Sequence, residues 1–215
     1  MRRTAPGVLN DLIRERLAGT TPGAPEEVRV PGLGGDLPGI LRRVRVRRLV
    51  PAAVLVPLIE HPDGLTVLLT RRADDLKHHP GQISFPGGRL EERDSGPAAA
   101  ALRETHEETG LESERVEIVG YLDNYLTITG YSVTPVVGFV QPGFDYVPDE
   151  TEVAEIFEVP LAHLFDPANV VRRRKRFMGL TLPYYEIPYG PYQIWGATAG
   201  MIVGFRGRIY PKESE

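Results

Sequence analysis

One strong helix signal, with strand signals on both sides of it, limits the folds that this chain can adopt. Residues 98–102, Ala-Ala-Ala-Ala-Leu, have high helix propensity. Pro97 suits the first position of a helix, and Gly110 suits the residue just past its end. The sequence therefore predicts a helix over 97–109.

Short apolar segments, separated by glycine and proline, predict strands before and after this helix. The tetrapeptide 61–64, His-Pro-Asp-Gly, is a hairpin signal between two of them. The predicted strands are 41–49 (an edge strand rich in arginine), 52–59, 65–70, 116–122, 133–140 and 153–159. Strands around a central helix are typical of an α/β (α+β) sandwich, a mixed β-sheet with flanking helices, and we expect a single domain.

The two ends of the chain carry weaker signals. Residues 9–17 predict a short amphipathic helix and 20–39 a loop, so we expect residues 1–48 to form an N-terminal helix, loop and edge strand packed on the core of 49–215. Residues 160–165 predict a helical turn. Residues 194–203 predict a packed helix that buries Trp195 in the core.

Composition excludes several classes of function. Lys plus Arg number 25 and Asp plus Glu 29, a net charge of −4, which argues against partners that need a positive field, such as nucleic acid or an anionic membrane. The chain has no cysteine, so disulfides, thiolate metal sites and cysteine nucleophiles are excluded. Residues 1–17 are charged throughout and predict neither a signal peptide nor a membrane span, so we expect a cytoplasmic protein.

The predicted helix carries three carboxylates on one face. Glu104, Glu107 and Glu108 stand at i, i+3 and i+4, a spacing at which like charges repel. A generic run of this kind is a solvated surface, but Arg103 can pair with Glu107, and residues 87–88, Gly-Gly, offer backbone carbonyls that a cation can approach. Carboxylates beside open carbonyls suit a hard divalent cation, Mg²⁺ or Mn²⁺.

This stretch resembles the signature of the Nudix hydrolase family. Residues 103–111, Arg-Glu-Thr-His-Glu-Glu-Thr-Gly-Leu, match its second half, with Thr105 at a hydrophobic position. In its first half, counted from Gly88, Asp94 stands where the family has Glu, and eight residues rather than seven separate it from Arg103.

A second resemblance points to the coenzyme A diphosphatase branch of that family. Residues 68–73, Leu-Leu-Thr-Arg-Arg-Ala, and 81–88, Gly-Gln-Ile-Ser-Phe-Pro-Gly-Gly, are similar to its additional motif, with Lys77 at the position of an arginine. Residues 131–138, 152–161 and 195–200 also resemble this branch. The resemblance covers about residues 50–205, and 1–45 match nothing of use.

The resemblance implies a Nudix fold and metal-dependent hydrolysis of coenzyme A to adenosine 3′,5′-bisphosphate and 4′-phosphopantetheine. It implies Glu104 and Glu108 as metal ligands, with a further ligand from the carbonyl of Gly88 or its neighbour, and catalytic roles for Glu107 and Arg103. The partner is a small-molecule substrate, coenzyme A or a related nucleotide diphosphate, and a homodimer stays open.

The remaining site residues are predicted from charge. The acidic segment 149–152 can supply the base that activates water, with Glu152 the first choice. A substrate with a 3′-phosphate needs cations, for which Arg71, Arg72 and Lys77 lie close to the Gly-Gly turn. The cationic run 172–176 is a further supply, but five adjacent cations are typical of a solvated segment.

Three alternatives stay open. A related Nudix hydrolase would take another diphosphate, such as ADP-ribose, a dinucleotide or an oxidised nucleoside triphosphate. A non-catalytic nucleotide-sensing module would keep the fold and lose the metal carboxylates, which are present here. Processing of RNA ends fits poorly with the net charge of −4.

Overall fold

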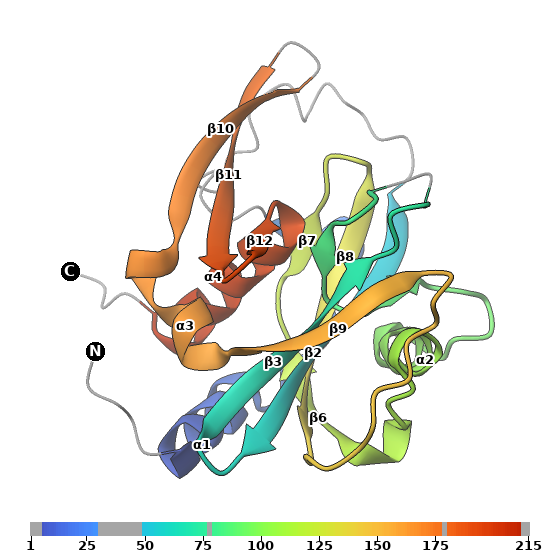
Figure 1. Ribbon diagram of the computed structural model, residues 1–215, viewed down its shortest axis with the longest axis vertical. Helices are drawn as coiled ribbons and strands as arrows, with labels where there is room; N and C mark the ends of the chain where they lie inside the picture. Colours follow the sequence, from blue (N-terminus) through green and yellow to red (C-terminus); the bar gives the residue numbers. More distant parts are fainter. Residues whose placement is uncertain (1–5, 30–48, 77–78, 178–179, 212–215) are drawn as a thin grey trace.

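The computed structural model describes residues 6–29, 49–76, 79–177 and 180–211 (Figure 1). Its main β-sheet contains nine strands within these residues: β1 (Val28–Arg29), β2 (Val50–His61), β3 (Gly64–Arg72), β4 (Ile83–Ser84), β5 (Gly87–Arg89), β6 (Val116–Tyr121), β7 (Asn124–Leu126), β8 (Tyr131–Val140) and β9 (Val153–Pro160). The order is β1-β7-β8-β2-β3-β4, with β5 on β2, β6 on β8 and β9 on β3. β2 is parallel to β8 and antiparallel to β3, so the sheet is mixed, as predicted.

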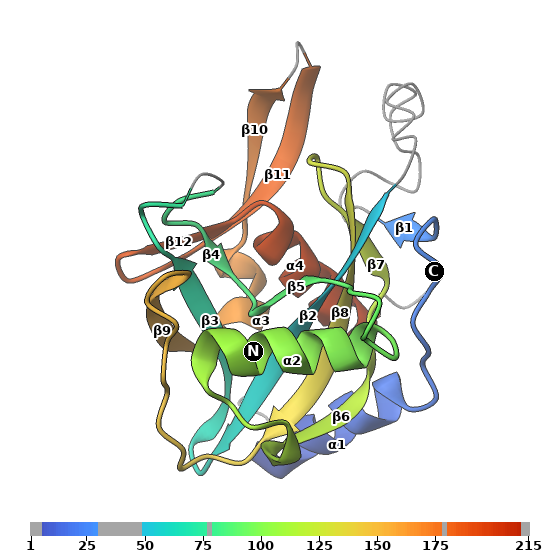
Figure 2. The ribbon, with the colours of Figure 1, turned by 90° about the vertical axis from the view of Figure 1, so that its right-hand side faces the viewer.

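Helices cover both faces of this sheet. They are α1 (Pro6–Leu17), α2 (Pro97–Thr109), α3 (Leu161–Phe165) and α4 (Ala197–Ile209). Of these four α-helices of the described residues, α2 covers one face and the other three cover the opposite face (Figure 2). Central strand β2 is apolar on both sides because Ala53 and Leu55 face the α2 side while Ala52 and Val56 face the other.

A second, three-stranded antiparallel sheet stands beside α4 (Figure 1). It consists of β10 (Val171–Phe177), β11 (Leu180–Tyr189) and β12 (Tyr192–Trp195). The cationic run 172–176, which we predicted to be a solvated segment, is exposed. It lies in β10, which pairs with β11 along its whole length.

The predicted helix over 194–203 is wrong at its start. Ile194 pairs with Ile187 of β11 and both are fully buried, so this part of the segment continues a strand. Gly196, with φ 67°, then turns the chain, and α4 begins at Ala197. Trp195 consequently ends a strand and is partly exposed rather than buried in a helix core.

Most other predicted elements are confirmed. The strands predicted at 52–59, 65–70, 116–122, 133–140 and 153–159 correspond to β2, β3, β6, β8 and β9, and the helix predicted at 97–109 is α2. The edge strand predicted at 41–49 lies, apart from its last residue, outside the described residues. α1 buries Ile13 and Leu17 completely in the core, while the division of the chain at residue 48 stays a prediction. None of the helices among the described residues is long and apolar enough to cross a membrane.

Candidate active site

Helix α2 is held in place by its ends and by one apolar face. Gly110 takes the left-handed conformation (φ 73°) just past the helix, and its N–H donates to the carbonyl of His106. Ala100 and Ala101 are fully buried against the sheet. Thr105 occupies the adjacent buried position, and its hydroxyl donates to the Ala101 carbonyl at 2.6 Å, which explains why a polar residue is accepted there.

Glu108 is the most deeply buried of the three carboxylates on α2. Its side chain accepts a hydrogen bond from the backbone N–H of Gly87, at 3.2 Å. Burial raises the pKa of Glu108 to about 8, and the charge of Glu104 adds to this rise, while the Gly87 hydrogen bond and the Arg72 charge oppose it. A carboxylate that resists ionisation in this way is stabilised by a bound cation.

Glu104 lies directly against Gly88 of strand β5. A Cβ atom added at Gly88 would come within 2.5 Å of both carboxylate oxygens, so no residue with a side chain fits there without displacing Glu104. Pairing of β5 with β2 fixes this approach, because Gly88 lies opposite Ala53 in the sheet. Burial also raises the pKa of Glu104.

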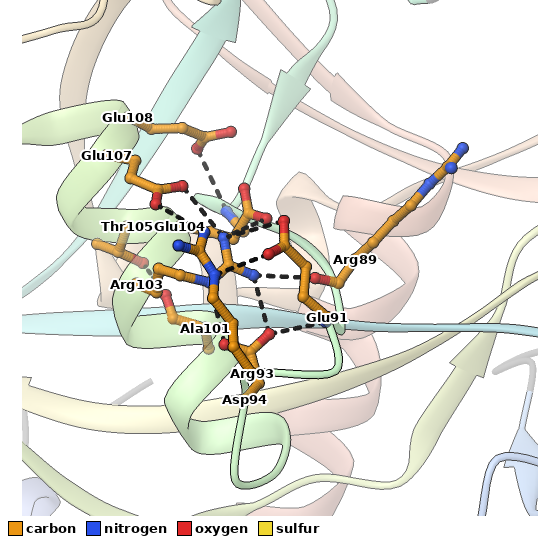
Figure 3. Close-up of polar contacts among 11 residues, drawn as sticks. Arg89, Glu91, Arg93, Asp94, Ala101, Arg103, Glu104, Thr105, Glu107 and Glu108 are labelled. Atoms are coloured by element: carbon orange, nitrogen blue, oxygen red, sulfur yellow. Dashed lines mark hydrogen bonds and ion pairs between the residues drawn. The ribbon is translucent and has the colours of Figure 1, made fainter.

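Arg103 is the centre of a polar network that joins α2 to the loop before it (Figure 3). Its Nε and Nη2 donate to the two oxygens of Asp94, at 3.0 and 2.9 Å. Its Nη1 donates to Glu104 at 2.9 Å and to Glu107 at 3.1 Å, the second being the pair expected from the sequence. A further bond goes to the carbonyl of Arg89. Arg103 therefore orients two of the three helix carboxylates.

Asp94 occupies the point where the sequence departs from the family signature. Hydrogen bonds from Arg103, supported by the backbone N–H of Glu91, lower the pKa of Asp94 to about 2. The side chain is nearly inaccessible to solvent, at 4% exposure. Asp94 therefore serves as the anchor of Arg103, a role that sequence reasoning missed although the spacing marked the position.

Glu107 is half exposed and both of its oxygens have guanidinium partners. One faces Arg103 and the other lies 3.4 Å from Arg93. Arg93 also pairs with Glu91 at 2.7 Å. No sequence signal identified Arg93 or Glu91 as members of this network. Glu107 is therefore part of the hydrogen-bond network that positions Glu104.

The segment 141–152 brings an acidic residue to the same place. The N–H of Val147 donates to the Thr109 carbonyl at 2.9 Å, and the N–H of Asp149 donates to the Glu108 carbonyl at 3.2 Å, so the segment crosses the end of α2. Glu152 follows, is exposed, and its charge contributes to the raised pKa of both Glu104 and Glu108. The structure therefore brings Glu152 into electrostatic range of these two carboxylates.

The cationic side chains predicted to bind phosphate have different surroundings in the structure. Arg72 is near enough to Glu108 to oppose the rise in its pKa. Arg71 instead pairs with Asp74 at 3.1 Å and with Glu155 at 3.5 Å. The pairing between β3 and β9 shifts register between these two arginines, which is where their surroundings diverge. Lys77 lies outside the described residues.

Comparison with known proteins identifies the family. A sequence model described as the NUDIX domain matches residues 49–179. The chain belongs to the Nudix family. It is 43% identical over 172 residues to an uncharacterized Nudix hydrolase, NudL, of Enterobacter sp. (strain 638), covering 77% of this chain and 84% of that protein. NudL of Escherichia coli (strain K12) is also 43% identical, covering 70% and 78%. The crystal structure of the Nudix hydrolase RenU from M. smegmatis is 28% identical, with a TM-score of 0.46, over 53% of this chain and 72% of that one.

The chain is thus a Nudix hydrolase, which acts on the diphosphate bond of a nucleoside diphosphate derivative, and enzymes of this family generally need divalent metal ions. Among the described residues, no group of three or more Asp, Glu or His side chains is arranged so that it could hold a metal ion. The residues nevertheless fit a hard cation. Glu104 and Glu108 offer carboxylate oxygens beside the glycines of β5, and Mg²⁺ typically takes one or two carboxylates and completes its shell with water and phosphate.

Proposed function

We propose that this Nudix hydrolase cleaves the diphosphate bond of coenzyme A, releasing adenosine 3′,5′-bisphosphate and 4′-phosphopantetheine. The proposal rests on the position of the branch-specific motif, residues 68–88, next to the carboxylates of α2. Within residues 68–88, the glycines of β5 border these carboxylates, because Gly88 lies against Glu104 and the N–H of Gly87 donates to Glu108. The charge of Arg72, at the end of β3, also acts on Glu108. The segment closes on itself, since the N–H of Arg72 donates to the Gln82 carbonyl and the N–H of Gly81 donates to the Arg72 carbonyl. One end of a motif that resembles the coenzyme A branch thus meets the carboxylates of α2.

Glu104 and Glu108 are the proposed ligands of Mg²⁺ or Mn²⁺, together with the carbonyl of Gly88. When bound, the metal ion neutralises phosphate charge and lowers the pKa of a coordinated water. Arg103 and Glu107 have the task of keeping Glu104 in one orientation, because the guanidinium contacts both carboxylates. This hydrogen-bond network organises the carboxylates of the site before the substrate binds.

Glu152 is the proposed base. It is exposed and lies in electrostatic range of Glu104 and Glu108, so it can accept the proton of the attacking water. The water oxygen forms a bond to one phosphorus, and the bond from that phosphorus to the bridging oxygen breaks. The second phosphate leaves with the electron pair of the bridging oxygen.

Arg72 is the first candidate for a contact to substrate phosphate because its charge already acts on Glu108. Arg71, which is tied to Asp74 and Glu155, and Lys77 stay secondary candidates. A cytoplasmic location also stays a prediction, and a homodimer stays open.

A substrate panel tests the proposal. We expect the ratio kcat/KM to be highest for coenzyme A among coenzyme A, dephospho-coenzyme A, ADP-ribose and a diadenosine polyphosphate, with Mg²⁺ or Mn²⁺ present. Preference for ADP-ribose or the dinucleotide would keep the family and overturn the proposed substrate. Absence of turnover on all four, with retained nucleotide binding, would instead support the nucleotide-sensing module.

A further inference from the structure

The second sheet has two different faces. Along β11 and β12, Ile187 and Ile194 point into the core and are fully buried. Residues of the opposite face alternate with them and surround an open hollow of about 270 Å³. The hollow is lined by Lys175, Tyr184, Glu186, Gln193 and Trp195, which we call the aromatic hollow.

The aromatic hollow combines flat rings with a positive charge. The Lys175 Nζ lies 5.1 Å from the centre of the Trp195 ring, and the Tyr184 ring meets Trp195 edge to face at 5.9 Å. Lys175 and Gln193 are exposed, and Trp195 is partly exposed. The indole face offers a planar ligand a stacking surface, and the Tyr184 ring, at 70° to it, can contact the edge of that ligand.

The polar groups of the aromatic hollow fit a nucleotide better than a simple aromatic compound. Gln193 carries both a donor and an acceptor, and the carboxylate of Glu186 accepts hydrogen bonds, which are the groups that read the edge of an amino-substituted base. Arg173 lies 3.5 Å from Glu186 and balances its charge. The ammonium group of Lys175, at the Trp195 ring, can bind an anionic group such as a phosphate.

The aromatic hollow adjoins the segment that borders the active site. Strand β12 packs against β4, and the Thr198 hydroxyl at the start of α4 donates to the Ile83 carbonyl at 3.0 Å. Gly196, which follows Trp195, faces Gln82, whose Nε2 would lie 3.8 Å from a Cβ placed there. Figure 2 shows β12 and β4 on one side of the molecule, above α2.

We propose that the aromatic hollow is a nucleotide-binding site that stacks an adenine base on Trp195, with Tyr184 at the edge of the base, and takes the phosphate on Lys175. The nucleotide is either the adenosine phosphate end of a substrate held at Glu104 and Glu108 or a separate molecule. Binding at the hollow does not depend on which diphosphate bond is cleaved.

The chain carries its own reporter of this binding, because Trp195 is its single tryptophan. We would titrate the full chain with AMP in the presence of EDTA and follow tryptophan emission. AMP is expected to quench the emission, with adenosine binding more weakly and inorganic phosphate causing no quenching. No change in emission at millimolar AMP overturns the proposal.

Two charge-matched variants locate the site. Lys175→Gln removes the cation of the hollow, whereas Arg174→Gln removes a cation of the same exposed strand on its other face. We expect the Kd for AMP to rise about fivefold to tenfold in Lys175→Gln and less than about twofold in Arg174→Gln. Equal effects in the two variants would mean that AMP responds to the general charge of β10 and would overturn the proposal.

Hydrolysis kinetics then distinguish the two sources of the nucleotide. If the KM for coenzyme A rises in Lys175→Gln in step with the Kd for AMP, the hollow holds the nucleotide end of the substrate. If the KM stays constant while AMP binding weakens, the hollow holds a separate nucleotide. A failure of the substrate proposal would leave the fluorescence titration interpretable, so the two proposals fail separately.

Discussion

The carboxylate face of α2 and the aromatic hollow of the second sheet organise charge in opposite ways. On α2, Arg103 contacts Asp94, Glu104 and Glu107, so the cation is enclosed by carboxylates. In the hollow, Lys175 is exposed and lies over the ring of Trp195. The first region fixes its own groups in place, and the second leaves a cation and a ring accessible.

Because of this difference, the two regions are suited to different functions. A network that positions carboxylates around a buried Glu108 is suited to holding a cation in one geometry, which catalysis requires. An open surface of rings and one cation is suited to recognition, where the ligand supplies the missing partner.

The largest effect is expected from Glu108→Gln. Loss of this proposed metal ligand should lower kcat by about a thousandfold or more, and Mn²⁺ binding measured by calorimetry should be lost with it. Because burial already raises the pKa of Glu108 to about 8, a neutral glutamine should not lower the free energy of unfolding measured in EDTA.

Glu114→Gln is the matched control, since Glu114 is exposed just beyond α2. It should leave kcat, Mn²⁺ binding and stability unchanged. Full turnover by Glu108→Gln would remove Glu108 from the metal site.

Asp94→Asn should break the anchor of Arg103 without changing Glu104 or Glu108, the proposed metal ligands. We expect kcat or metal affinity to fall about 10–100-fold, the usual consequence of losing a residue that orients a ligand. Asp63→Asn, in the exposed hairpin between β2 and β3, is the control and should behave as the unmodified protein.

The same variant has a pH signature. The pKa of Asp94 is lowered to about 2, below its value of about 3.9 in an unfolded chain. Its contribution to stability is therefore complete above about pH 4 and is lost as the pH falls towards 2. Urea unfolding of the unmodified protein and Asp94→Asn should differ most at pH 5 to 6 and converge as the pH falls to about 2. A difference that grows in acid would contradict the assignment.

Tyr146→Phe should loosen the segment that carries Glu152. The Tyr146 hydroxyl donates to Glu158, and Thr66 donates to the same carboxylate from β3. We expect kcat to fall about threefold to tenfold with KM nearly constant, because the base is less well placed. Hydrogen exchange at the amides of Val147 and Asp149 should quicken.

Thr66→Val is the control for this prediction because it removes a hydrogen bond to Glu158 without altering the 141–152 segment. It should leave exchange at those two amides slow. If both variants quicken exchange equally, Tyr146 has no special part in holding Glu152.

The smallest effects should separate the two neighbouring arginines. Arg72→Gln should raise the KM for coenzyme A about threefold to tenfold, since Arg72 acts on Glu108. Arg71→Gln should raise it less than about twofold, because Arg71 is already paired with Asp74 and Glu155. Equal increases in steady-state KM would show that the two side chains share one role.

The carboxylate face could be predicted because its information is local. Spacing along one helix places Glu104, Glu107 and Glu108 together, and Pro97 and Gly110 mark its ends. The anchor Asp94 was harder to foresee, since its partner Arg103 lies nine residues away across a loop whose path the sequence does not specify.

The second sheet escaped prediction because its information is not local. The five cations of 172–176 are exposed, as predicted for a solvated segment, but that they form a strand is known only from pairs such as Arg173 with Tyr184 on β11. The small residues after Trp195 likewise favour a helix, and only the pairing of Ile194 with Ile187 shows that a strand precedes it. Cross-strand register decides both cases.

The most direct test of the central claim is product analysis after incubating the purified chain with coenzyme A, with and without Mg²⁺ or Mn²⁺. We predict adenosine 3′,5′-bisphosphate and 4′-phosphopantetheine in equal amounts, only when metal is present, and none from Glu108→Gln. Intact coenzyme A under every metal condition, alongside cleavage of ADP-ribose by the same preparation, would contradict the proposed substrate.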